Sequence, residues 1–321
     1  MRIASFAYDA LSESQRAEYV RLLREHPRFA EDFQSKLPAE LQTEAERARW
    51  IFLWASVWPD LVKGQPAYER GPWHYVNLPL SLRGGKLATC SEARAALPES
   101  QRRATAERAA RRRAEPSPPA VVATSSGADL TPSEPEEIRT ALAWARRTLG
   151  DRARPAPQRA LALTWLLHLV GDAHQPLHAV ALFTERRFPL GDRGGNDILA
   201  GPVPLHRVWD SLLGDDVALP LVQQQARGWL ADTELRSLAG TAVQTLEIDA
   251  WLDEDCALAR RSVYSESVLA AVQRADGGAL DTKPEVSLGK AYLDGARRAA
   301  QRRAVQAGGR LAAILQGLPR P

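Results

Sequence analysis

The chain has 321 residues, of which 45% are hydrophobic and 25% are charged, as is usual for a globular protein. Its formal net charge of +3 is too small to predict nucleic-acid binding by itself, and the sequence pI of about 9.0 favours such binding only weakly. Because no run of about 18 apolar residues occurs, the sequence excludes a transmembrane helix. The two cysteines, Cys90 and Cys256, allow either one disulfide or two buried thiols, and so leave the redox compartment open.

Helical periodicity dominates the chain. Capping residues followed by apolar side chains three or four apart predict helices over residues 12–29, 43–58, 136–150, 156–173 and 288–318. In the last of these a loosening is expected at Gly308 and Gly309. Only "HYVNLPL", residues 74–80, has the character of a short strand. The pattern predicts a mostly α-helical protein, and the length allows either one large domain or two.

Residues 98–135 differ from the rest of the chain in composition. Their first part carries six arginines between positions 102 and 113, and their second part is rich in Pro, Ser and Thr. Too little apolar surface is present to offset the chain entropy lost on folding, so we predict an exposed, disordered insertion. Its arginines could contact nucleic acid, although a solvated run of charge is the simpler interpretation.

Two pairs of histidine and aspartate are spaced by one helical turn. His168 and Asp172 lie four residues apart in a predicted apolar helix and therefore face the same side. His206 and Asp210 repeat this spacing in "LHRVWD". A proline ends the first helix before His178, which can therefore point to a second position beside the first pair.

Two further residues complete the candidate site. Asp60 directly follows a predicted helix, and His74 lies in the predicted extended stretch. Imidazole and carboxylate together suit zinc at hydrolytic sites that keep a position open for water. Taken singly, each residue is more simply explained as a core histidine, a helix cap or a local hydrogen bond. Taken together they favour a metal site, with these candidate ligands: Asp60, His74, His168, Asp172, His178, His206 and Asp210.

The other two of the six histidines have different predicted roles. His174 lies off the face that His168 and Asp172 share, so we expect a structural or supporting role for it. His26, in "REHPRF", is expected to be an ordinary surface residue.

The motifs "WHYVNLP", "HLVGDAHQPLH", "GGND" and "LHRVWD" occur in this order. With them the chain resembles the zinc-dependent, single-strand-preferring nucleases of the S1/P1 type, from "AYDAL" near the start to "GGRLA" near Arg310. The resemblance implies an all-α single domain of the phospholipase C and P1 nuclease type, with three zinc ions at the bottom of a cleft. It assigns one zinc ion to Asp60, His74, His168 and Asp172, and a second to His178, His206 and Asp210.

The start of the chain departs from the family pattern. In the family a third zinc ion is held by an N-terminal Trp, by a His in a Gly-His pair a few residues later, and by the aspartate that corresponds to Asp172. Neither that Trp nor that His precedes "RIASFAYDAL", and the first residues do not have the pattern expected of a signal peptide. We therefore expect either a longer, secreted gene product that starts upstream of Met1, or a form with two zinc ions.

The resemblance also implies an activity. Family members hydrolyse phosphodiester bonds of single-stranded DNA or RNA to leave 5′-phosphates, often with 3′-nucleotidase activity, and zinc acidifies the attacking water. Asp60 would orient that water, and Lys63 would stabilise negative charge in the transition state. Tyr75 would stack on a base and Asn77 would contact its edge. Asn196, in "GGND", would hold a phosphate oxygen. Core packing for Tyr75 and turn capping for Asn196 are the simpler alternatives.

Two alternatives to a nuclease stay open. A zinc phospholipase C has the same three-zinc helical architecture but hydrolyses phospholipid head groups. A zinc-binding protein without turnover would account for the missing third site. The aromatic residue at position 75 and the "GGND" motif favour nucleotides or single-stranded nucleic acid as the substrate. The resemblance further implies a monomer that is secreted or periplasmic.

Overall fold

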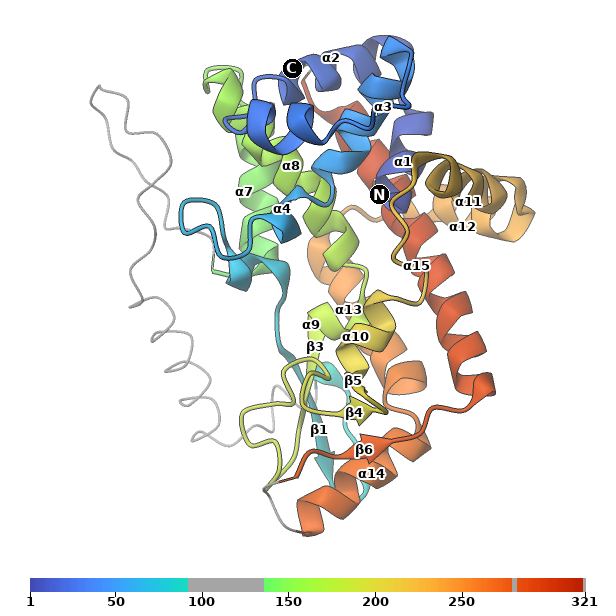
Figure 1. Cartoon of the computed structure of the whole chain (residues 1–321). Helices are drawn as coiled ribbons and strands as arrows, with labels where there is room; N and C mark the ends of the chain where they lie inside the picture. Colours follow the sequence, from blue (N-terminus) through green and yellow to red (C-terminus); the bar gives the residue numbers. More distant parts are fainter. Residues whose placement is uncertain (92–135, 279–281, 320–321) are drawn as a thin grey trace.

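The computed structural model describes residues 1–91, 136–278 and 282–319 of the chain. Most of these residues are helical (Figure 1), which confirms the all-α fold class. The insertion predicted for residues 98–135 lies outside the described residues. No helix in the described part of the chain has the length and apolar character needed to cross a membrane.

Helices follow one another along most of the described chain. The first part contains α1 (Arg2–Ala10), α2 (Glu13–Leu23), η1 (Phe29–Phe33), η2 (Gln34–Lys36), α3 (Glu44–Ala55), α4 (Trp58–Leu61) and η3 (Gly71–His74). The middle part contains α7 (Ile138–Gly150), α8 (Ala156–Asp172), α9 (Pro176–Ala179), α10 (Leu205–Asp210), α11 (Leu219–Ala231) and α12 (Thr233–Ala242). The last part contains α13 (Ile248–Leu258), η4 (Ala259–Val263), α14 (Glu266–Gly277) and α15 (Lys290–Gly317).

Six short strands accompany the helices in the described residues, more than the single stretch that the sequence predicted. They are β1 (Leu78–Arg83), β2 (Lys86–Leu87), β3 (Val180–Phe183), β4 (Leu199–Ala200), β5 (Val203–Pro204) and β6 (Glu285–Val286). They form two three-stranded sheets, in the orders β2-β1-β3 and β5-β4-β6. The predicted strand at residues 74–80 is only partly right, because His74 ends the η3 turn and β1 begins at Leu78.

Helix α8 is the buried centre of the helical end of the molecule. Nearly every residue from 160 to 170 is buried, and α7 packs along its length while α2, α3 and α4 contact its other sides. The ring of Trp165 in α8 lies 4.8 Å from Trp73 and 5.4 Å from His74. This packing brings η3 against α8 and fixes where the His74 ring can lie.

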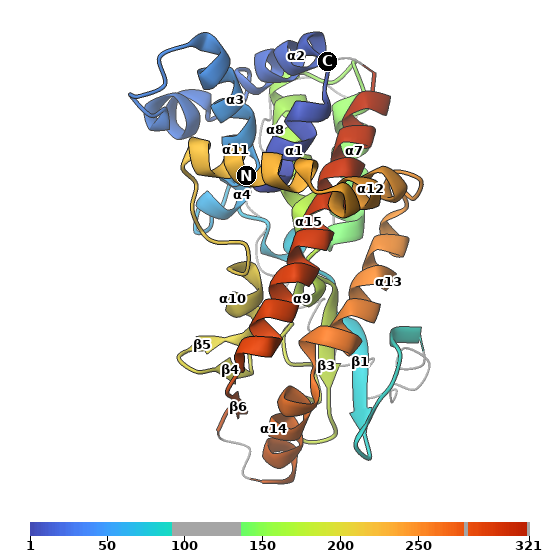
Figure 2. The same ribbon diagram turned by 90° about the vertical axis from the view of Figure 1, so that its right-hand side faces the viewer.

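Helix α15 runs along much of the molecule, with α1 and α12 packed across it (Figure 2). The loosening predicted at Gly308 and Gly309 is wrong, because the helix is continuous through both residues. A Cβ atom at Gly308 would lie 2.7 Å from the Phe6 ring, and one at Gly309 would lie 2.8 Å from Ala239 O. The two glycines therefore let α1 and α12 approach the helix backbone closely.

Parallel pairing of β1 with β3 joins two segments that are about 100 residues apart in the sequence. Leu78 pairs with Val180, and the register continues to Ser81 with Phe183. Just before this ladder, Val76 N–H donates to His178 O at 2.8 Å. The pairing therefore places the residues around His74 beside those around His178.

Cys90 and Cys256 form a disulfide, with their Cα atoms 6.3 Å apart. Of the two alternatives that the sequence allowed, the structure thus selects the cross-link. Cys256 lies near the end of α13, and Cys90 follows β2, so the bond connects the C-terminal helices to the edge of the β2-β1-β3 sheet.

His26 is buried, which makes its predicted surface position wrong. Only 3% of the residue is exposed, and its ring lies 5.1 Å from Phe33 and 4.5 Å from Trp58. Its Nδ1 accepts a hydrogen bond from Arg28 N–H. Because the chain turns back after α2, the rings of Phe33 and Trp58 cover His26. The local sequence around His26 does not indicate this packing.

Candidate metal centre

Side chains from three separate elements meet near the end of α8. Asp60 comes from α4, His74 from η3 and His168 from α8. Asp60 Oδ1 lies 3.9 Å from His74 Nδ1 and 3.8 Å from His168 Nε2. The two ring nitrogens are 2.9 Å apart. The three residues form one group of converging donor atoms.

Asp172 lies between this group and a second one. Its Oδ2 is 2.9 Å from His74 Nδ1 and 3.1 Å from His168 Nε2. Its Oδ1 lies 3.7 Å from His178 Nδ1. The contact with His168 follows from their spacing of four residues on one helix. One carboxylate therefore faces both groups.

His178, His206 and Asp210 form the second group. Asp210 Oδ1 lies 3.5 Å from His178 Nε2, and Asp210 Oδ2 lies 3.5 Å from His206 Nε2. The two imidazole rings have their centres 4.9 Å apart. All seven residues that the sequence proposed as ligands thus lie together, in two adjacent groups.

Three of the four histidines donate Nδ1–H to a backbone carbonyl. The acceptors of His168, His178 and His206 are Ser56 O, His74 O and Gly194 O, at 2.8, 2.8 and 2.7 Å. In the neutral ring these bonds leave Nε2 without a proton, and its lone pair faces the carboxylates. Backbone carbonyls commonly fix the rings of metal-binding histidines in this way.

The carboxylates and imidazoles shift one another's pKa. Burial alone would raise the pKa of Asp172, but the charges of His168 and His178 hold it well below its usual range. Burial would also raise the pKa of Asp210, yet hydrogen bonding and charge from His178, together with His206, lower it to about 2. Conversely, Asp172 and Asp210 raise the pKa of His178 to about 10 against the effect of burial. The carboxylates therefore stay ionised, and they favour a positive charge beside them, either a proton on His178 or a bound cation.

The donor atoms fit the geometry of zinc. Zinc binds imidazole nitrogen and carboxylate oxygen at about 2.0–2.1 Å, so neighbouring ligands of a tetrahedral ion lie roughly 3.3 Å apart. Within the two groups the separations of 2.9–3.9 Å bracket this value. Mixed nitrogen and oxygen donors also suit zinc better than the all-oxygen sites of calcium or magnesium. Each group could therefore hold one zinc ion.

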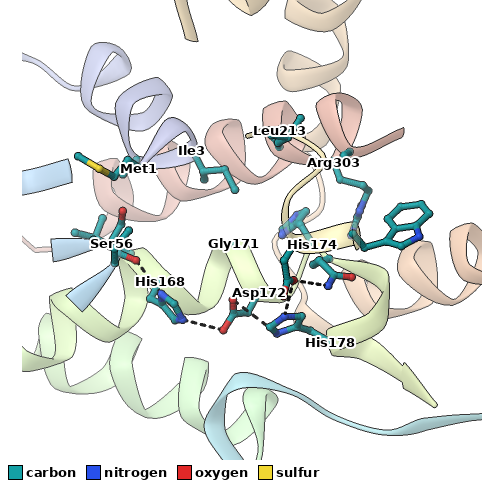
Figure 3. Close-up of a pocket in the computed structure, with 18 of the residues that line it drawn as sticks. Met1, Ile3, Ser56, His168, Gly171, Asp172, His174, His178, Leu213 and Arg303 are labelled. Atoms are coloured by element: carbon teal, nitrogen blue, oxygen red, sulfur yellow. Dashed lines mark hydrogen bonds and ion pairs between the residues drawn. The ribbon is translucent and has the colours of Figure 1, made fainter. Parts of the chain in front are cut away.

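A pocket of about 250 Å³ is lined by four of these residues, His168, Asp172, His178 and Asp210. Figure 3 shows His168, Asp172 and His178 side by side along one wall, with Met1 and Ile3 across from them. The pocket therefore has a wall of ionisable groups and a largely apolar wall from the N-terminal segment and α15. Such a mixture of polar and apolar lining is usual for small-molecule sites.

Among the other candidate residues, Lys63 contacts a member of the first group. Lys63 Nζ forms an ion pair with Asp60 Oδ1 at 2.7 Å, and these side chains are 59% and 49% exposed. Tyr75, next to His74, is half-buried, and Asn77 is exposed. The Asn196 amide donates to Arg193 O at 2.9 Å, within its own loop.

Gln175 was missed by sequence reasoning. Its Nε2 donates to Asp210 Oδ1 at 2.8 Å, while its Oε1 accepts from Leu177 N–H at 2.5 Å. The second bond fixes the orientation of the amide, so that the NH2 group faces the carboxylate. The available signal was a polar residue directly before Pro176, where it caps α9.

His174 takes part in neither group. Its Nδ1–H donates to Val170 O at 2.7 Å, and its Nε2 accepts from Arg310 at 2.9 Å. Both ring nitrogens are thus occupied by protein partners, and the ring links α8 to α15.

Paired clusters of histidine and aspartate, set in a pocket of a helical protein, are typical of metal-dependent hydrolases. The chain matches the S1/P1 Nuclease family over residues 1–319, and it therefore belongs to this family. Membership makes the protein a nuclease that hydrolyses phosphodiester bonds, with nucleic acid as its substrate. No curated protein matches the chain.

Proposed function

We propose that this protein is a zinc-dependent nuclease that cleaves single-stranded nucleic acid to products with 5′-phosphates and also has 3′-nucleotidase activity. The observation that carries the proposal is the carboxylate of Asp172, which faces both groups of donor atoms. Two cations held side by side suit phosphodiester hydrolysis, because the attacking and the leaving oxygen both need charge stabilisation.

Each zinc ion has a proposed set of ligands. The first set is Asp60, His74, His168 and Asp172, and the second is His178, His206 and Asp210. When bound, zinc supplies Lewis-acid activation of water and of the phosphodiester. We propose two zinc ions for the chain as given.

Asp60 and Lys63 are the proposed catalytic residues. Asp60 is the most exposed of the proposed ligands, so its carboxylate can also accept a hydrogen bond from the attacking water and orient it. Burial would lower the pKa of Lys63, but hydrogen bonding to Asp60 raises it, and the ammonium stays charged. This charge would stabilise negative oxygen atoms of the phosphate in the transition state.

Tyr75, Asn77 and Asn196 are the proposed substrate contacts. Tyr75 directly follows His74, so a base stacked on its ring would lie near the first group, and stacking requires an unpaired base. Asn77 is exposed two residues further on and would contact the base edge. The Asn196 amide donates one N–H to Arg193 O and would hold a phosphate oxygen with its second N–H.

We further propose a monomer with one domain, in which residues 98–135 are an insertion. We also propose that the protein is secreted or periplasmic. The disulfide between Cys90 and Cys256 supports this location, because disulfides persist mainly in oxidising compartments.

Metal analysis and a nuclease assay test the proposal together. The purified protein should contain two zinc ions and should hydrolyse single-stranded DNA faster than duplex DNA. His168→Ala and Asp210→Ala should each release one zinc ion and lower hydrolysis more than about a hundredfold, because losing a ligand has a larger effect than losing an outer partner. Asp249→Ala is the control, since this aspartate is 77% exposed and forms an ion pair with Arg139, away from both groups in the sequence.

Two results would contradict the proposal. Two bound zinc ions without hydrolysis of nucleic acid would identify a zinc-binding protein without turnover. Faster hydrolysis of phospholipid vesicles than of single-stranded DNA would identify a phospholipase C.

A further inference from the structure

The loop of residues 191–197, between β3 and β4, makes contacts that a substrate role for Asn196 does not explain. His206 Nδ1–H donates to Gly194 O at 2.7 Å, and His206 N–H donates to Gly195 O at 3.4 Å. Both the ring and the backbone of His206 are therefore held by this loop.

Gly194 lies against the backbone of α9. Its φ is +60°, and a Cβ atom there would lie 2.2 Å from Leu177 O and 3.5 Å from His206 Nδ1. Glycine alone tolerates both the positive φ and this close approach. The loop therefore fills the space between α9, which carries His178, and α10, which carries His206.

A buried carboxylate holds the loop in place. Asp192 is 0% exposed, and its Oδ1 accepts from Leu182 N–H at 2.9 Å while its Oδ2 accepts from Tyr264 O–H at 2.8 Å. Within the loop, Asp192 O also accepts from Asp197 N–H at 3.1 Å. Breaking the hydrogen bonds of a buried acceptor costs free energy, because each group that loses its partner stays buried without a hydrogen bond to protein or water. Asp192 thus connects β3, the loop and the residue that follows η4.

We propose that Asp192 and Tyr264 are positioning residues for the second metal group. The Tyr264–Asp192 hydrogen bond fixes the loop, and the loop fixes the His206 ring through Gly194 O. Neither residue is placed to touch substrate. The inference rests on the proposed function, because it assigns these residues a role toward zinc at His206. The packing of this loop against Leu177 also explains the two glycines of "GGND", because a Cβ atom at either position would crowd Leu177.

Tyr264→Phe tests this role by removing a single oxygen atom. Tyr19→Phe is the matched control, since Tyr19 and Tyr264 are each 1% exposed and Tyr19 O–H donates to Leu315 O at 2.6 Å in another part of the fold. Zinc bound per chain is measured over a series of buffered free zinc concentrations. Tyr264→Phe should shift one of the two binding phases about tenfold to higher free zinc, because the loss of a residue that supports a metal ligand typically weakens metal binding by at least this factor. The other phase, and both phases of Tyr19→Phe, should stay within about twofold.

Asp192→Asn is a second variant, because one carboxylate oxygen becomes an NH2 group, which cannot accept a hydrogen bond from Leu182 N–H or Tyr264 O–H. It should shift the same binding phase, and thermal unfolding establishes that each variant is folded. Unchanged phases in both variants, or equal shifts of both phases, would overturn the positioning role while leaving the metal centre intact. An unaltered protein without two zinc-binding phases would instead overturn the proposed function itself.

Discussion

Gly309 lies so close to α12 that one added methyl group should destabilise the protein. A Cβ atom at this position would lie 2.8 Å from Ala239 O, a backbone atom that no change of rotamer can move. Gly309→Ala gains about 1 kcal/mol in helix propensity but adds overpacking that costs roughly 1–3 kcal/mol. The free energy of unfolding should therefore fall by up to about 2 kcal/mol.

Gly295→Ala is the matched control in the same helix. Beyond its own helix backbone and chain neighbours, a Cβ atom at Gly295 would meet no atom of the described residues within 4 Å, so this variant should be more stable by about 1 kcal/mol. The two variants should differ by roughly 1–3 kcal/mol, with Gly309→Ala the less stable. Urea unfolding followed by circular dichroism measures the difference. Equal gains in both variants would refute the close packing of α12 on α15.

Three further predictions concern the disulfide, a buried histidine and the insertion. Replacing Cys90 and Cys256 by Ala opens a cross-link with a sequence separation of 166, which should lower stability by up to about 5 kcal/mol and Tm by about 7 °C. Reduction of the unaltered protein should lower Tm similarly, and an unchanged Tm would contradict the cross-link. Burial lowers the pKa of His26 from 6.5 to about 3. As pH falls from 6.5 towards 3, His26 binds a proton in the unfolded chain but not in the folded protein, so the free energy of unfolding decreases. Between pH 7 and pH 4.5 the unaltered protein should lose about 2–3 kcal/mol more than His26→Gln, as measured by urea unfolding, and equal losses would count against the burial. Deleting residues 100–133 should leave zinc content and nuclease activity unchanged, whereas failure to fold would exclude an insertion.

Features that depend on local geometry could be predicted from the sequence. Residues four apart on a helix are neighbours whatever the rest of the chain does, so the spacing alone pairs His168 with Asp172 and His206 with Asp210. The mostly helical fold followed from the same periodicity. The motifs around these pairs also carried the resemblance to the nuclease family that the whole chain confirms.

How distant segments meet could not be predicted in this way, because it depends on long-range packing and strand pairing. The pairing of β1 with β3 brings His74 O to His178, and the loop of residues 191–197 brings Gly194 O to His206. These contacts use backbone groups, which every residue carries, so no side-chain pattern marks them in the sequence. The burial of His26 and the close approach at Gly309 have the same origin, because both depend on which remote helix or ring packs against the residue.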